Sequence, residues 1–444
     1  MLPEVSVGRR RVRWHPPAVP DGSKVTSLYV HVPFCAHKCE YCAFFSEASS
    51  GELINRYVGA LVREMELVAH DLQPRTVFFG GGTPSMLNLR QWEKILRAME
   101  RLNLLGAGEW TIESNPATVS LDKGKLWRDF GVNRVSMGVQ SLDERLLDRL
   151  GRIHSREQVF KSFDILRAAG FDNLNVDLMF AIPTQTMGVW SDTLREAIAL
   201  GSEHLSCYEV IYEEDTPLYA QLKAREFDVD EELACAMYDE LVATAGKHGL
   251  VQYEIANFAR TNLSKVQSPK SKAGHETSSV SSALDLGPWT LDVPSRACAH
   301  NVNYWRGGSF HGLGPSATGY VRGVRTKNWS NTQMYCEQLE KGKRAIESTE
   351  QLSPKARAGE TAAFGLRMPA GWNFEEFKSI THYDLRDGWA EEMNRLVAQG
   401  LAEMDEFGFR LNARGLRFAD TAAEEFLRFE PERLSPLPLM AARD

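Results

Sequence analysis

Residues 29–42 read YVHVPFCAHKCEYC, a short apolar segment that leads directly into Cys35, Cys39 and Cys42, spaced C-x3-C-x2-C. Three thiolates this close must converge on a metal or repel one another. Thiolates are soft ligands that select zinc, copper(I) or iron–sulfur clusters. A structural zinc site needs a fourth ligand, and no second C-x2-C pair exists, although His37 lies in the same loop. Cysteine-only ligation of an iron–sulfur cluster therefore fits the loop better, with zinc as the open alternative.

Strand and helix patterns alternate along residues 26–215 and predict a parallel sheet with right-handed crossovers. About six such units fit, which predicts an incomplete barrel. We expect strands at residues 27–32, 76–79, 110–113, 134–139, 174–181 and 205–211, with helices between them.

Ligands of parallel α/β folds bind at the carboxyl ends of the strands, so the polar residues there are site candidates by position. The glycine run at 80–82 permits close approach of the backbone to a ligand, a guanidinium suits a carboxylate, and a charge within an apolar strand is costly unless it is paired. Helix caps and structural ion pairs are the alternative interpretation. The candidates are Gly81, Gly82, Thr83, Glu113, Gln140, Arg152 and Asp177.

The pattern Tyr-x-His-x-Pro-Phe-Cys and the three cysteines resemble the radical S-adenosylmethionine (SAM) superfamily. More narrowly, they resemble the branch that contains the oxygen-independent coproporphyrinogen III oxidase HemN and the haem chaperone HemW. The resemblance implies a partial (β/α)6 barrel with a smaller C-terminal helical domain. It also implies that Cys35, Cys39 and Cys42 bind a 4Fe-4S cluster whose fourth iron is chelated by SAM. The SAM contacts that it implies are Tyr29, Gly81, Gly82, Thr83, Glu113, Gln140, Arg152 and Asp177.

A second motif, His300-Asn-Val-Asn-Tyr-Trp305, follows much later. A neutral imidazole is a good iron ligand, and Tyr and Trp can flank a porphyrin. A core histidine is the structural alternative. The motif resembles the signature of the haem-chaperone side of the branch, which implies a haem-binding role for His300.

Phe44 favours the chaperone, because the resemblance places a fourth cysteine of the oxidase at this position. We therefore expect a haem chaperone that binds the 4Fe-4S cluster, SAM and haem and delivers haem to an acceptor protein, for which a membrane-associated haem enzyme is a candidate. The alternatives are a coproporphyrinogen III oxidase (dehydrogenase), which would be an enzyme, and a related radical SAM methyltransferase. Radical chemistry would require an electron donor such as flavodoxin or ferredoxin.

The expected organisation has six parts: an N-terminal arm at 1–25, the barrel at 26–260, a flexible insertion at 261–297, a connector with the histidine motif at 298–346, the helical domain at 347–430 and a tail at 431–444. Residues 216–260 read as helical, and 407–411 resemble a strand. The net charge of −8, a basic arm without an apolar stretch behind it, and no apolar run of transmembrane length predict a cytoplasmic protein that binds no nucleic acid.

Overall fold

The structure is a computed structural model, and it describes residues 23–48, 50–260 and 293–427. Most of the arm predicted at 1–25, the predicted tail and most of the insertion predicted at 261–297 lie outside these ranges.

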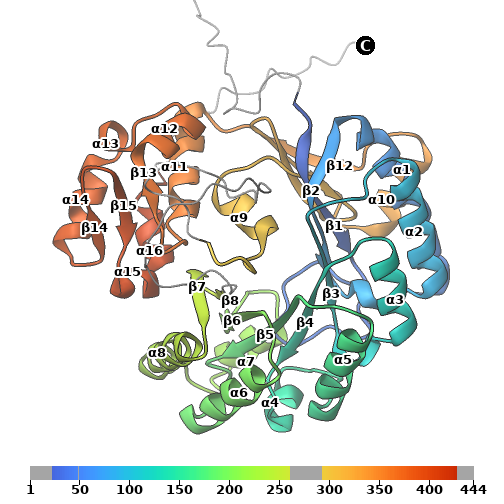
Figure 1. Cartoon of the computed structure of the whole chain (residues 1–444), viewed down its shortest axis with the longest axis horizontal. Helices are drawn as coiled ribbons and strands as arrows, with labels where there is room; N and C mark the ends of the chain where they lie inside the picture. The colour runs from blue at the N-terminus through green and yellow to red at the C-terminus, as the bar shows by residue number, and fades with distance from the viewer. Residues whose placement is uncertain (1–22, 49, 261–292, 428–444) are drawn as a thin grey trace, which may run out of the picture.

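A curved nine-stranded sheet dominates the fold, in the order β7-β8-β6-β5-β4-β3-β2-β1-β9 (Figure 1). Its first six strands pair in parallel, each with the next in sequence, which confirms the predicted partial barrel. These strands are β1 (Val25–Val32), β2 (Leu72–Gly81), β3 (Glu109–Ser114), β4 (Arg134–Gln140), β5 (Leu174–Phe180) and β6 (His204–Glu209).

The crossover helices line the outside of this sheet in Figure 1. They are α1 (Gly51–Val68), α2 (Leu89–Arg101), α3 (Leu121–Asp129), α4 (Glu144–Arg149), α5 (Arg156–Ala168) and α6 (Met187–Ala199). The sequence sets where they begin. Asn88 with Gln91, and Ser155 with Gln158, form capping boxes that satisfy the free N–H groups of α2 and α5.

The prediction that residues 216–260 are helical is wrong at its end. Helices α7 (Pro217–Lys223) and α8 (Glu231–Lys247) are followed by two antiparallel strands, β7 (Leu250–Glu254) and β8 (Asn257–Arg260). Each of these strands buries apolar side chains, Leu250 and Tyr253 on β7 and Phe258 and Ala259 on β8. This burial favours strands that extend the sheet beyond β6. The Glu254 carboxylate closes the turn between the strands by accepting from the Ala256 N–H at 2.8 Å.

The chain then returns to the β1 edge of the sheet. Its elements are α9 (Ala299–Trp305), β9 (His311–Leu313), β10 (Thr318–Val321), β11 (Val324–Asn328), α10 (Thr332–Glu340) and β12 (Ile346–Glu350). Strand β9 pairs in parallel with β1, and β10, β11 and β12 form a separate antiparallel sheet. The buried Glu64 carboxylate on α1 fastens this stretch by accepting from the Gly314 N–H at 2.8 Å, the Asn328 amide at 2.8 Å and the Tyr335 hydroxyl at 2.7 Å.

The C-terminal elements surround a second core that contains Trp372, Phe377 and Trp389. Their helices are α11 (Pro354–Gly365), α12 (Phe374–Thr381), α13 (Leu385–Gly388), α14 (Ala390–Ala398), α15 (Ala413–Arg417) and α16 (Ala419–Glu424). A three-stranded sheet accompanies them, with β13 (Trp372–Asn373), β14 (Ala402–Met404) and β15 (Gly408–Leu411), the last of which is the strand expected near 407–411. Throughout the described ranges, no helix has both the length and the apolar character needed to cross a bilayer.

Candidate functional site

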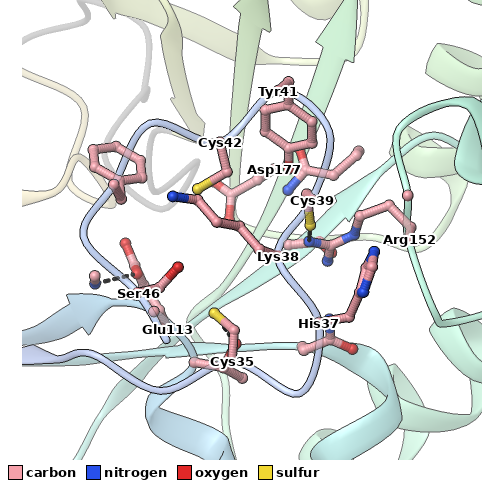
Figure 2. Close-up of a pocket in the computed structure, with 18 of the residues that line it drawn as sticks. Cys35, His37, Lys38, Cys39, Tyr41, Cys42, Ser46, Glu113, Arg152 and Asp177 are labelled. Atoms are coloured by element: carbon pink, nitrogen blue, oxygen red, sulfur yellow. Dashed lines mark hydrogen bonds between the residues drawn. The ribbon is translucent and has the colours of Figure 1, made fainter. Parts of the chain in front are cut away.

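A cavity of about 430 Å³ opens at the carboxyl ends of the parallel strands, under the cysteine loop. This volume is in the range of small-molecule sites. Figure 2 shows the loop cysteines facing side chains from the neighbouring strands. The cavity brings together these predicted site residues: Cys35, Cys39, Cys42, Gly81, Gly82, Thr83, Glu113, Gln140, Arg152 and Asp177. Tyr29 and His300 are not part of its lining.

Backbone hydrogen bonds fix the cysteine loop at its base and at its middle. At the base, the Cys35 N–H donates to the Glu47 carbonyl at 3.2 Å, and the Glu47 N–H donates to the Pro33 carbonyl at 2.7 Å. At the middle, the Glu40 N–H donates to the Leu150 carbonyl at 3.1 Å, and the Glu40 carbonyl accepts from Leu218 at 2.9 Å. The loop is therefore held in place without a metal.

The three cysteine thiols are partly buried and unpaired with one another. Within the described ranges, no three His, Cys, Asp or Glu side chains are close enough to share one metal ion. A four-iron cluster takes one thiolate on each of three irons, so its ligands surround a cage rather than a point.

The surroundings of Cys42 disfavour an unpaired thiolate. Burial, reinforced by Cys39 and Cys35 nearby, raises the pKa of the Cys42 thiol. Three thiols on one loop nonetheless fit a 4Fe-4S cluster, whose iron atoms would hold them as thiolates.

The glycine turn at the end of β2 leaves no room for side chains at Gly81 and Gly82. A Cβ on Gly82 would lie 2.7 Å from the Val32 carbonyl oxygen, and one on Gly81 would lie 2.4 Å from the His31 ring. Gly81 also has φ of +100°, a conformation that favours glycine. The turn can thus lie directly against β1 and leave its backbone facing the cavity.

His31 links this turn to the far end of the cysteine loop. Its Nε2–H donates to the Phe45 carbonyl at 2.8 Å, so its Nδ1 accepts from the Tyr29 hydroxyl at 3.0 Å. Burial lowers the pKa of His31, which keeps the ring neutral for this pair of bonds. Tyr29 therefore acts on the loop through His31 in this structure and does not line the cavity.

Two half-buried carboxylates face the cavity from β3 and β5. Burial, with the Asp177 carboxylate nearby, raises the pKa of Glu113 to about 8, although the Gly81 N–H donates to Glu113 Oε2 at 3.1 Å. Burial also raises the pKa of Asp177, which accepts from Ser136 at 2.9 Å and Asn175 at 2.7 Å. Two neighbouring acids with little access to water favour a cationic ligand, and the ammonium and sulfonium groups of SAM supply such charge.

Gln140 and Arg152 border the same cavity from the β4 side. Gln140 has φ of +67°, a left-handed conformation that is costly for a residue with a side chain and that accompanies a bulge against β5. The Arg152 guanidinium donates to the Gly138 carbonyl at 2.6 Å and to Cys39 Sγ at 3.4 Å. Its buried Nε–H has no partner in the described part of the chain, so the guanidinium retains a free donor.

His300 lies outside the cavity lining. It is 1% exposed, on α9 against the middle of β2, where its ring stacks on Phe78. Thr76 donates its hydroxyl to Ser27, so Nδ1–H of His300 donates to Thr76 at 2.9 Å, and its Nε2 accepts from the Tyr304 hydroxyl at 2.6 Å. In this conformation neither nitrogen of His300 is available to an iron.

Three further residues have contacts that were not predicted from the sequence. His31 positions the loop, and it was visible as the histidine of the Tyr-x-His-x-Pro-Phe-Cys pattern. Glu109 caps α9 by accepting from the Ala299 N–H at 2.8 Å and the His300 N–H at 3.0 Å, and no local pattern announces this contact. Tyr41 lines the cavity between two of the cysteines.

The fold and the cysteine loop together define a radical SAM protein. The model of the radical SAM superfamily matches residues 29–197. The chain belongs to this superfamily and, within it, to the HemN/HemW branch.

Two relatives match almost their full length. The heme chaperone HemW of Lactococcus lactis is 30% identical over 406 residues, which cover 91% of this chain and 98% of that protein. HemW of Bacillus subtilis is 30% identical over 407 residues, which cover 90% and 99%.

The solved structure of coproporphyrinogen III oxidase (HemN) from Escherichia coli has a TM-score of 0.73 at 21% identity and covers 91% of this chain and 90% of that one. At this identity, the likeness to HemN shows the fold alone.

Proposed function

We propose that this protein is a haem chaperone that holds a 4Fe-4S cluster and SAM in the cavity under the cysteine loop and transfers haem to an acceptor protein. The observation that carries the proposal is the full-length similarity to HemW proteins, which includes the C-terminal elements and the stretch with His300. The position of Phe44 beside the cavity agrees with it, because no fourth cysteine follows the cysteine loop.

Different residues of the chain would bind the cluster and SAM. Cys35, Cys39 and Cys42 would hold the cluster, while Glu113 and Asp177 would face the cationic part of SAM. When bound, the cluster and SAM supply one-electron radical chemistry given an electron donor such as flavodoxin or ferredoxin. The remaining residues proposed to bind SAM are Gly81, Gly82, Thr83, Gln140 and Arg152. Tyr29 would contribute indirectly, by way of its hydrogen bond to His31.

The test is anaerobic reconstitution of the full chain with iron and sulfide, followed by titration with SAM and haem. We expect a cluster chromophore, a Soret shift on addition of haem, and movement of that haem to a haem-free acceptor such as apomyoglobin. A protein that carries the cluster but binds no haem would contradict the proposal.

The same sample, given a reductant, SAM and coproporphyrinogen III, tests the oxidase alternative. We expect no vinyl product and no methylated product. Formation of the vinyl product would favour the oxidase, and methylation would favour a methyltransferase.

A further inference from the structure

The mouth of the cavity is lined by large apolar side chains that remain exposed. They are Phe44, 69% exposed, Ile211, 66%, Ile153, 53%, and Tyr208, 43%. Single exposed apolar residues are ordinary, but these four come from three distant stretches and meet at one opening. We call them the apolar rim.

Two polar side chains of the cysteine loop accompany the apolar rim. His37 and Lys38 are exposed and line the same cavity. Within residues 23–48, 50–260 and 293–427, neither side chain has a hydrogen bond, an ion pair or a ring contact. Both are labelled in Figure 2, on the loop that carries the cysteines.

Haem needs apolar contact for its macrocycle, an axial ligand for its iron and cations for its propionates. The three thiols nearby are assigned to the cluster, and of the remaining ligand types an exposed, neutral imidazole suits an iron at the mouth of the cavity best. Among the cavity-lining residues that the structure describes, His37 is the one histidine. Its ring nitrogens are free, whereas those of His300 and His31 are bonded on both sides.

Access distinguishes the two candidate histidines as well. A carrier must release its cargo to another protein, so the cargo needs an edge that the acceptor can reach. His37 lies at the open mouth of the cavity, while His300 is enclosed between β2 and α9. Use of His300 would require Tyr304 and Thr76 to give up their hydrogen bonds inside a packed interior.

We propose that haem binds across the apolar rim, with a ring nitrogen of His37 as its axial iron ligand, Phe44 and Ile211 against the macrocycle and Lys38 beside a propionate. This inference rests on the proposed haem-chaperone function and assigns its cargo site. The deeper part of the cavity, with Glu113 and Asp177, stays available to SAM, so haem and SAM occupy neighbouring positions over one loop.

The experiment is an anaerobic haem titration of the cluster-loaded full chain, with iron and sulfide measured for every variant. We expect His37→Ala to weaken haem binding by about tenfold or more and to change the Soret and low-spin signatures. His70→Ala is the matched control, because His70 is exposed and lies outside the cavity lining. Its titration should match that of the wild type.

Three further measurements separate ligation from a general effect on the loop, and a fourth tests whether haem and SAM bind side by side. Imidazole added to His37→Gly should restore the wild-type Soret band. Iron-free protoporphyrin should bind the wild type and His37→Ala equally, because it has no iron to ligate. Ile211→Asp, outside the cysteine loop, should weaken both haem and protoporphyrin, and saturating SAM should leave haem bound.

Haem affinity unchanged in both His37→Ala and Ile211→Asp would overturn this site and leave the haem-chaperone function standing. A loss in His37→Gly that imidazole does not rescue would reject axial ligation by His37, and displacement of haem by SAM would reject the side-by-side arrangement. A wild-type protein that binds no haem would instead remove the proposed function itself.

Discussion

Replacement of Glu113 by Gln isolates the energetic cost of the buried acid in the cavity. The amide has the same shape and keeps an oxygen that can accept the Gly81 N–H, but it cannot ionise. Glu113 has a pKa raised to about 8, first by burial and then by the nearby Asp177 carboxylate. Ionisation of Glu113 at neutral pH therefore costs free energy in the folded wild-type protein, and this cost is absent in the variant.

The sign follows from the proton balance between the folded and unfolded states. The folded protein keeps the Glu113 proton up to about pH 8, whereas the unfolded chain loses it near pH 4.5. Stability of the wild type should thus fall relative to Glu113→Gln as the pH rises through this window. Each pKa unit is worth about 1.4 kcal/mol, so the difference approaches roughly 5 kcal/mol above pH 8 and roughly 3 kcal/mol at pH 7 as an upper bound.

The assay is urea unfolding of cluster-free wild-type and variant protein at pH 5, 6, 7, 8 and 9. All other titrating groups are shared, so the difference in unfolding free energy between the two proteins reports Glu113 together with its interaction with Asp177. Glu213→Gln is a suitable control, because Glu213 is an exposed acid on the same cavity. Parallel stability curves for wild type and Glu113→Gln between pH 5 and pH 9 would refute the reasoning.

Three other substitutions test the cluster loop, the glycine turn and the helix α9. Cys39→Ser should abolish the cluster absorbance and lower iron and sulfide content while circular dichroism stays that of a folded protein; full iron and sulfide content would contradict its ligand role. Gly82→Ala places a Cβ 2.7 Å from the Val32 carbonyl oxygen and should cost about 1–3 kcal/mol in thermal unfolding, whereas Gly246→Ala, in open space on α8, should be neutral or stabilising. Glu109→Ala removes the cap of α9 and should cost about 1–2 kcal/mol, and an unchanged unfolding midpoint would show that the cap is dispensable.

The six parallel strands were predictable because each is a continuous apolar run followed by an amphipathic helix, and this local pattern leaves few topologies. Strands β7, β8 and β9 were not predicted. They are short, and they join the sheet through strands that are distant in sequence: β8 pairs with β6, β9 pairs with β1, and β7 is attached only through β8. The three residues of β9 become a strand only because β1 presents a free edge. A local pattern cannot report such a partner.

The gathering of Glu113, Gln140 and Asp177 at one cavity was predictable for a similar reason. Glu113 and Gln140 lie at the carboxyl ends of their strands, and Asp177 is the one charge inside the apolar strand β5 beside them; parallel strands bring such positions to one edge of the sheet. Their hydrogen-bond partners were not predictable, since the Asp177 carboxylate is bonded by Ser136 from the neighbouring strand β4 and by Asn175 two residues earlier on β5. The order of residues along the chain thus predicts which side chains meet, but not which of their polar atoms remain free.

His300 shows why free atoms decide a binding role. Its sequence context predicts an imidazole able to bind iron, and Tyr304, four residues on, was a local sign that a neighbour on the same helix face competes for it. Thr76, from β2, engages the other nitrogen, and no local pattern reports that contact. An imidazole bonded at both nitrogens must lose a hydrogen bond inside the protein before it can ligate iron, whereas the exposed His37 would exchange only hydrogen bonds to water, and this difference supports the haem position proposed at the mouth of the cavity.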